Sequence, residues 1–276
     1  MKPTEIINQL LHYAEEREMI RTVVLNGSLV NPNIKSDPYQ DVDMTFFATD
    51  VASIAQDNSW INAFGDVLIM QMPETADASR HVTFLVQYAE GHRIDLTIRS
   101  TDDLLETLET DSLSRVLLDR DGLAGQPFPS ERSYRVMRPS AEQYAACWNE
   151  FWWVSLYVVK GIKRHQVLYA LDHLEIMRNM LRQMMEWNIG YATDFTVNLG
   201  KSGDGMREHL PEEIWDMLCA TYASAELSAL EDTHDRLMSL FFFCAQRVAE
   251  QGEFFFPEEE ARRVRSACAT LWHSND

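Results

Sequence analysis

The sequence has few cysteines, few basic residues and no long apolar run. Its four cysteines are Cys147, Cys219, Cys244 and Cys268, and no two of them form a CxxC pair. A zinc site and a disulfide framework are therefore both disfavoured, and we expect reduced thiols, most of them in helical core positions. No apolar run approaches the roughly 20 residues that a membrane-spanning helix needs.

Positive charge is scarce, because 24 lysines and arginines face 43 acids, for a formal net charge of −19. A field of this sign repels nucleic acid and attracts cations, so we expect no nucleic-acid partner. The first 22 residues carry charges throughout, with the apolar spacing of an amphipathic helix rather than of a signal peptide. We therefore expect no membrane association and a cytoplasmic location.

The chain divides into two halves of different character. Short strands are predicted at 23–25, 41–47, 67–72, 81–88 and 92–99, and a helix at 50–64. A connector rich in glycine and proline runs from 119 to 139. Helices are predicted after it at 141–163, 166–187, 212–218, 228–250 and 257–272. The pattern predicts an α+β fold, with an α/β domain over residues 1–136 and an all-α helical domain over residues 137–276.

Two acids lie on one predicted strand. Asp41 and Asp43 are two residues apart, so both side chains leave the same face of the strand. Carboxylates of this kind suit Mg²⁺, which prefers a few carboxylates together with substrate phosphates. Taken alone, such a pair is more often two solvated surface acids.

Two further features support a nucleotide-and-metal site. Gly27 and Ser28 end a short strand, where glycine allows close approach to a phosphate, although an ordinary Asn-Gly turn has the same sequence. Asp95 lies on a later alternating strand with the parity to face the same edge of the sheet. It could instead be a surface acid paired with Arg93 or Arg99. The three features in this order are more specific than any one of them.

At this point the chain resembles the DNA polymerase β-like nucleotidyltransferase superfamily, and within it the aminoglycoside 6-adenylyltransferases, also called streptomycin adenylyltransferases. The resemblance is carried by the segments LNGS at 25–28, NPN at 31–33, QDVD at 40–43, FG at 64–65, LIMQ at 68–71, RIDLT at 93–97, NEFWW at 149–153, YVVKG at 157–161 and LGK at 199–201. It covers nearly the full chain. The family usually has arginine after Gly-Ser, where this chain has Leu29.

The resemblance implies a mixed-sheet nucleotidyltransferase domain followed by a helical bundle. The implied activity is that of a streptomycin 6-O-adenylyltransferase, which transfers AMP from ATP to a drug hydroxyl, releases pyrophosphate and confers antibiotic resistance. Asp41 and Asp43 would hold Mg²⁺ against the triphosphate. Asp95 would complete a second metal position and is the candidate general base.

The resemblance also implies roles for the helical half. Lys160 and Lys201 would neutralise the β- and γ-phosphates, and Asp172 would bind the cationic drug. Each has a plainer explanation: Lys160 as a lysine near a helix end, and the other two as surface residues. The expected partners are ATP and a cationic aminoglycoside such as streptomycin, and we expect a monomer.

Two other functions stay open. The first is a nucleotidyltransferase acting on another small-molecule or protein hydroxyl. The second is a catalytically impaired nucleotide-binding homologue, which only Leu29 favours.

Overall fold

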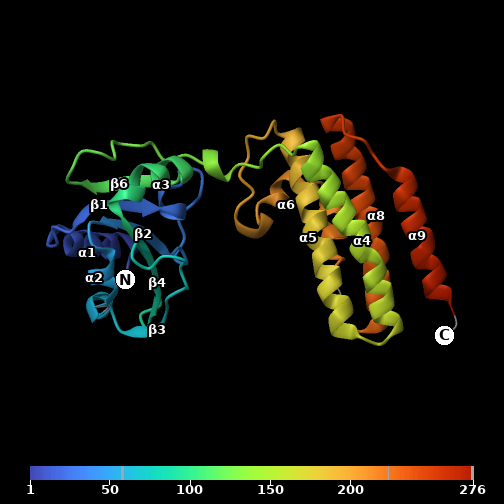
Figure 1. Cartoon of the computed structure of the whole chain (residues 1–276), viewed down its shortest axis with the longest axis horizontal. Coiled ribbons are helices and arrows are strands. Elements are labelled where there is room, and N and C mark those ends of the chain that lie inside the picture. Colours follow the sequence, from blue (N-terminus) through green and yellow to red (C-terminus); the bar gives the residue numbers. More distant parts are fainter. Residues whose placement is uncertain (57–58, 223, 275–276) are drawn as a thin grey trace. The chain divides into compact units, whose positions relative to one another are not determined.

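The computed structural model describes residues 1–56, 59–222 and 224–274 (Figure 1). The chain forms two compact units, Met1–Ser133 and Tyr134–Asp276. The division falls between residues 133 and 134. The boundary predicted from the sequence lies three residues later, between 136 and 137. Each unit has its own apolar core, so each is described by itself.

The first unit is built on one six-stranded sheet with the order β3-β4-β5-β2-β1-β6. The strands are β1 Ile20–Asn26, β2 Val42–Ala48, β3 Val67–Gln71, β4 His81–Tyr88, β5 Arg93–Ser100 and β6 Ser114–Asp119. β2 and β5 run parallel, and the other neighbouring pairs are antiparallel. The sheet is therefore mixed, and together with the helical second unit it confirms the predicted α+β fold.

The two faces of this sheet are covered unequally. Its helices are α1 Pro3–Glu15, α2 Val51–Gln56 and α3 Leu104–Thr110. The apolar face of α1, with Ile6, Leu10 and Ala14, belongs to a large core cluster that also contains alternate residues of the strands. On the other face, Leu104 of α3 belongs to a small cluster of only four buried side chains. The second face therefore has room for polar groups.

Two parts of the first unit differ from the sequence prediction. The helix expected over 50–64 is instead the short α2 and a 3₁₀ segment, Ser59–Phe64, while residues 57–58 lie outside the described part. Strand β6 was not predicted at all. It lies at an edge of the sheet and its burial is irregular, so the alternation that identifies a strand is weak.

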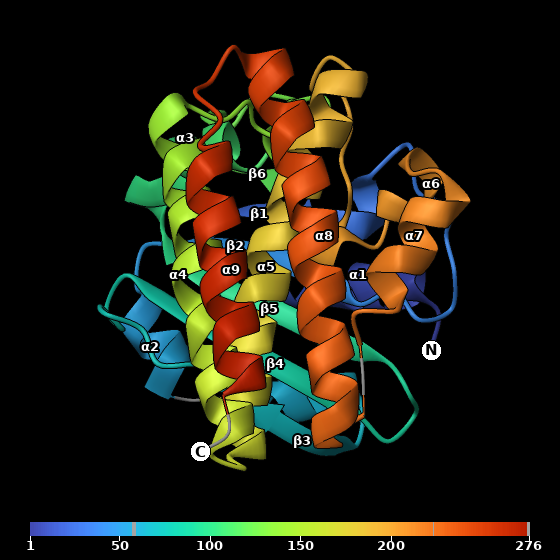
Figure 2. The same cartoon turned by 90° about the vertical axis from the view of Figure 1, so that its right-hand side faces the viewer.

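The second unit is a bundle of long helices, which lie alongside one another in Figures 1 and 2. The long helices are α4 Ala141–Lys163, α5 Val167–Ala192, α8 Leu227–Gly252 and α9 Glu258–His273, with the shorter α6 Met206–His209 and α7 Glu212–Cys219. Ser140 begins α4 with a capping box to Gln143. Phe151 of α4 stacks on Phe241 of α8, with ring centroids 3.7 Å apart. The buried aromatic residues therefore hold the bundle together.

A polar pair lies inside this bundle. Ser155 Oγ is 2.7 Å from His234 Nε2, and both side chains are fully buried. His234 Nδ1 has no hydrogen-bond partner among the described residues. Burial lowers the pKa of His234 to about 4, so the ring is neutral near pH 7.

The cysteines agree in part with expectation. Cys147, Cys244 and Cys268 are buried, Cys219 is exposed, and all four are free thiols. Across the described ranges, no helix is both long enough and apolar enough to cross a membrane.

Candidate active site

The site is built on the second face of the sheet, opposite α1. The register pairs Asp43 on β2 with Asp95 on β5, and Asn26 on β1 with Asp43. Paired residues on neighbouring strands leave the same face, so these three side chains form a row across the sheet. The flanking Met44 and Leu96 point the other way, into the core. The apolar alternation of β2 and β5 thus fixes which face carries the acids.

Gly27 lies directly against one of these acids. It follows β1 with φ +71°, and a Cβ added there would lie 2.8 Å from Asp43 Oδ2. Its N–H donates to the Leu113 carbonyl at 3.0 Å. Glycine is required here both for the left-handed backbone and for the space beside the carboxylate. The Gly27 amide is thus already bonded and not available to a phosphate, and the predicted phosphate-binding role of Gly27 and Ser28 stays a prediction.

The residues after Gly27 form one 3₁₀ turn, Gly27–Val30. Ser28 is half-buried in this turn, and its carbonyl accepts the Asn31 N–H at 3.3 Å. Leu29, where the family usually has arginine, packs against the large core cluster of this unit. Leu29 therefore supports the turn from the apolar side.

Asn26 is a site residue that the sequence analysis did not single out. Its Nδ2 donates to Ser114 Oγ at 2.9 Å and to Asp111 Oδ2 at 3.2 Å, and its Oδ1 accepts from Thr45 Oγ1 at 3.0 Å. These bonds tie the end of β1 to both neighbouring strands beside Asp43. Asn26 lies two residues after Val24 at the end of β1, so its side chain leaves the same face of the strand as that of Val24; this alternation is the sequence signal that could have identified it.

Arg93 joins two of the predicted acids. Its Nε and Nη2 donate to Asp95 Oδ1 and Oδ2, each at 2.7 Å, and its Nη1 lies 3.3 Å from Asp41 Oδ2. The hydrogen bonds to Asp95, and then the charges of the nearby acids, raise the pKa of Arg93. A pairing of Asp95 with Arg93 was the alternative explanation of this acid from the sequence, and the structure contains that pair.

The same groups bear on metal binding. Among the residues with described positions, no group of three or more histidine, cysteine, aspartate and glutamate side chains is arranged to hold a metal ion. Asp41, Asp43 and Asp95 nevertheless offer carboxylate oxygens, which are ligands that Mg²⁺ prefers. The guanidinium of Arg93 shows that a positive charge is held between Asp41 and Asp95. Arg93 would have to move for Asp41 and Asp95 to bind one metal ion together, and Mg²⁺ binding stays a prediction.

The candidates from the helical unit lie on separate elements. Lys160 is exposed on α4, with its ammonium 5.7 Å from the centroid of the Tyr157 ring. Lys201 is exposed and begins a 3₁₀ turn, Lys201–Gly203, after α5. Asp172 is exposed on α5. Their roles toward phosphate and drug stay predictions.

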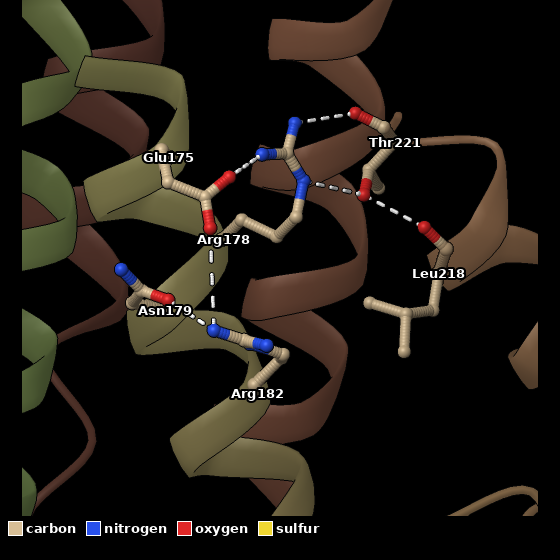
Figure 3. A network of polar contacts seen from close by, with 6 residues as sticks. All are labelled: Glu175, Arg178, Asn179, Arg182, Leu218 and Thr221. Carbon is tan, nitrogen blue, oxygen red and sulfur yellow. Dashed lines mark hydrogen bonds and ion pairs between the residues drawn. The ribbon is translucent and has the colours of Figure 1, made fainter. Parts of the chain in front are cut away.

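Close to Asp172, a buried arginine organises the surface of α5 (Figure 3). The Arg178 side chain is 7% exposed and donates to the Thr221 carbonyl at 2.7 Å and to Thr221 Oγ1 at 3.3 Å. Glu175 pairs with Arg178 and lies 4.0 Å from Arg182. Glu175 is therefore neutralised by two arginines, and Arg178 ties α5 to the segment just after α7. Asp172 is the solvated acid of this stretch.

Known proteins resemble the whole of this arrangement. The family described as "Streptomycin adenylyltransferase" matches residues 1–270. An aminoglycoside 6-adenylyltransferase of Campylobacter jejuni is 34% identical over 259 residues, covering 92% of this chain and 90% of the relative. One from Bacillus subtilis (strain 168) is 33% identical and covers 92% of each chain. The crystal structure of an aminoglycoside 6-adenyltransferase from Bacillus subtilis matches with a TM-score of 0.51 and 27% identity, covering 99% of this chain and 100% of that one.

Fold and comparisons together place the chain in the class of nucleotidyltransferase enzymes. More narrowly, it belongs to the streptomycin adenylyltransferase family.

Proposed function

We propose that this chain transfers AMP from ATP to a hydroxyl of an aminoglycoside, with streptomycin as the first candidate acceptor, and so confers resistance to the drug. The observation that carries the proposal is the row of Asn26, Asp43 and Asp95 beside Gly27 on the open face of the sheet. The proposal also draws on relatives that are named aminoglycoside 6-adenylyltransferases over nearly their whole length.

The chemistry required is an in-line displacement at the α-phosphorus. The acceptor oxygen forms a bond to that phosphorus, the bond to the bridging oxygen breaks, and pyrophosphate leaves. Asp95 accepts the proton of the attacking hydroxyl. Asp41 and Asp43, with Asp95, would hold Mg²⁺, which supplies positive charge to the phosphates when bound. Asn26 keeps the strand ends in place, and Gly27 leaves room for the Asp43 carboxylate.

The helical unit supplies charge of both signs. The ammonium groups of Lys160 and Lys201 are exposed and neutralise the β- and γ-phosphates in this proposal. Asp172 attracts the cationic drug, and the net charge of −19 concentrates cations around the whole protein. An acidic protein is thus well suited to an acceptor that carries guanidinium or ammonium groups.

The test is mass spectrometry of streptomycin after incubation with the protein, ATP and Mg²⁺, with pyrophosphate release followed in parallel. Wild-type protein should give the AMP adduct. Asp43→Asn should give none, because one carboxylate beside Gly27 loses its charge. Asp216→Asn, at an exposed acid of α7, is the matched control and should behave as wild type. Failure to modify any aminoglycoside in a panel would refute the proposal.

A further inference from the structure

A second feature of the helical unit has the character of a binding site. It is a pocket of about 320 Å³, lined at its ends by Tyr134 and Val136 of the connector, Gln183, Glu186 and Trp187 of α5, and Leu199. The volume lies at the lower end of the range for small-molecule sites, enough for one ring or one charged arm of a larger ligand.

Glu186 is an acidic, partly buried group that lines this pocket. Burial raises the pKa of its carboxyl, while Arg182 and a hydrogen bond from Gln183 act in the opposite direction. The Gln183 amide donates to Glu186 Oε2 at 3.2 Å. Within the described ranges no cationic side chain comes within 4.0 Å of this carboxylate. A partly desolvated carboxylate with only a neutral partner gains strongly from an incoming cation.

Arg182, whose charge acts on Glu186, is in direct contact with other residues. Arg182 bonds to Asn179 and lies 4.0 Å from Glu175, as Figure 3 shows. The Arg135 side chain also borders the pocket, but it is exposed, so its charged head can stay in water. A cationic group of a ligand would therefore be the first to pair directly with Glu186 among the described contacts.

The other walls match a flat or ring-borne cation. Trp187 is 6% exposed and lines the pocket together with Val136 and Leu199, so an aromatic and aliphatic wall stands beside the carboxylate. The side-chain amides of Gln143 and Gln183 add polar atoms. An apolar wall with one carboxylate and amide groups is the surface that binds a guanidinium, which is weakly hydrated and forms planar hydrogen bonds.

The pocket also begins where the chain enters the second unit. Ser133, the last residue of the first unit, accepts the Ser112 N–H on its Oγ at 2.9 Å. The carbonyl of Leu113, the residue after Ser112, accepts the Gly27 N–H. Tyr134 is the first residue of the second unit and already lines the pocket.

We propose that the Glu186 pocket is a subsite for one guanidinium or ammonium group of the cationic acceptor. The identity of the acceptor rests on the proposed function above. Glu186 then contributes to specificity, since it binds a part of the drug without taking part in phosphoryl chemistry. This role is separate from that of Asp172, which lies exposed on α5 more than three helical turns away.

The test is calorimetric titration of the full chain with streptomycin in the absence of nucleotide, followed by kinetics with ATP and Mg²⁺. Glu186→Gln should bind streptomycin about 10-fold more weakly and raise its KM by a similar factor, with kcat and the KM for ATP unchanged. Glu186→Asp, which keeps the charge, should retain more affinity. Circular dichroism confirms that each variant is folded.

A close control exists on α8. Gln246 donates to Glu250 Oε1 at 3.0 Å, the same kind of Gln–Glu pair, but exposed. Glu250→Gln should leave both binding and KM unchanged. Wild-type affinity and KM in Glu186→Gln would overturn the subsite while the proposed function stands. Streptomycin binding that depends on Glu186 without any AMP transfer would overturn the proposed function while the subsite stands. No streptomycin binding by the wild type would overturn the subsite.

Discussion

The contact between Gly27 and Asp43 makes a quantitative prediction for Gly27→Ala. Alanine at φ +71° costs about 1–2 kcal/mol relative to glycine, because its Cβ crowds the backbone in the left-handed region. The new methyl group would in addition lie 2.8 Å from Asp43 Oδ2, closer than such atoms approach in real proteins. The carboxylate must therefore move. We expect a loss of stability greater than the backbone cost and a fall in AMP transfer of about 100-fold.

Gly122→Ala separates the two contributions. Gly122 has φ +68°, nearly the same as Gly27, and an added Cβ would meet no atom within 4 Å. It should lose only the backbone cost of about 1–2 kcal/mol and keep full activity. Urea unfolding gives the stability of each variant, and pyrophosphate release gives the activity. Equal stability losses together with an active Gly27→Ala enzyme would refute the idea that Gly27 positions Asp43.

Three further predictions concern buried and paired charges. Because the folded pKa of His234 is about 4 and the unfolded value about 6.5, the unfolded chain takes up the proton first. Stability should therefore fall from pH 6.5 toward pH 4, by about 3 kcal/mol in total from this group. In urea unfolding, the stability of wild type minus that of His234→Gln should fall by this amount over the same range. A difference that does not change with pH would refute the reasoning. Arg93→Gln removes the guanidinium that lies beside Asp41 and Asp95. Mg²⁺ should therefore raise its melting temperature more than that of wild type, and an equal rise would contradict this. Arg178→Met should lower the free energy of unfolding in urea by about 3 kcal/mol, because the Thr221 carbonyl and Glu175 lose the buried guanidinium that they bind. Arg262→Met, at an exposed position, should cause no measurable change. Equal effects of the two substitutions would show that burial of the arginine does not matter.

Much of this architecture can be deduced from local sequence patterns. Alternation places Asp41 and Asp43 on one face of a strand, and the same parity applies to Asp95. The parallel pairing of β2 with β5 is different, because β3 and β4 separate the two strands in the chain and no local signal records which strands become neighbours. Only the fold shows that Asp43 and Asp95 are opposite each other.

The missing parts have physical reasons as well. Arg93 was recognised as a possible partner of Asp95, but its reach to Asp41 depends on how the chain before β2 lies beside β5. The Glu186 pocket combines the connector, α4, α5 and the loop after α5, and no single one of these segments has a distinctive pattern. Sites formed by several distant segments depend on tertiary packing, whereas a site on one strand is encoded by that strand.

The register of β2 against β5 also has an evolutionary consequence. The buried pairs Met44–Leu96 and Phe46–Ile98 hold the two strands in place, while the pair Asp43–Asp95 adds no apolar contact and Arg93 offsets the charge of Asp95. Two residues further on, the same face carries the neutral pair Thr45–Thr97. Loss of Asp43 would therefore remove none of the apolar contacts that join the two strands. In a lineage no longer selected for the activity, these acids should therefore be lost before the fold is.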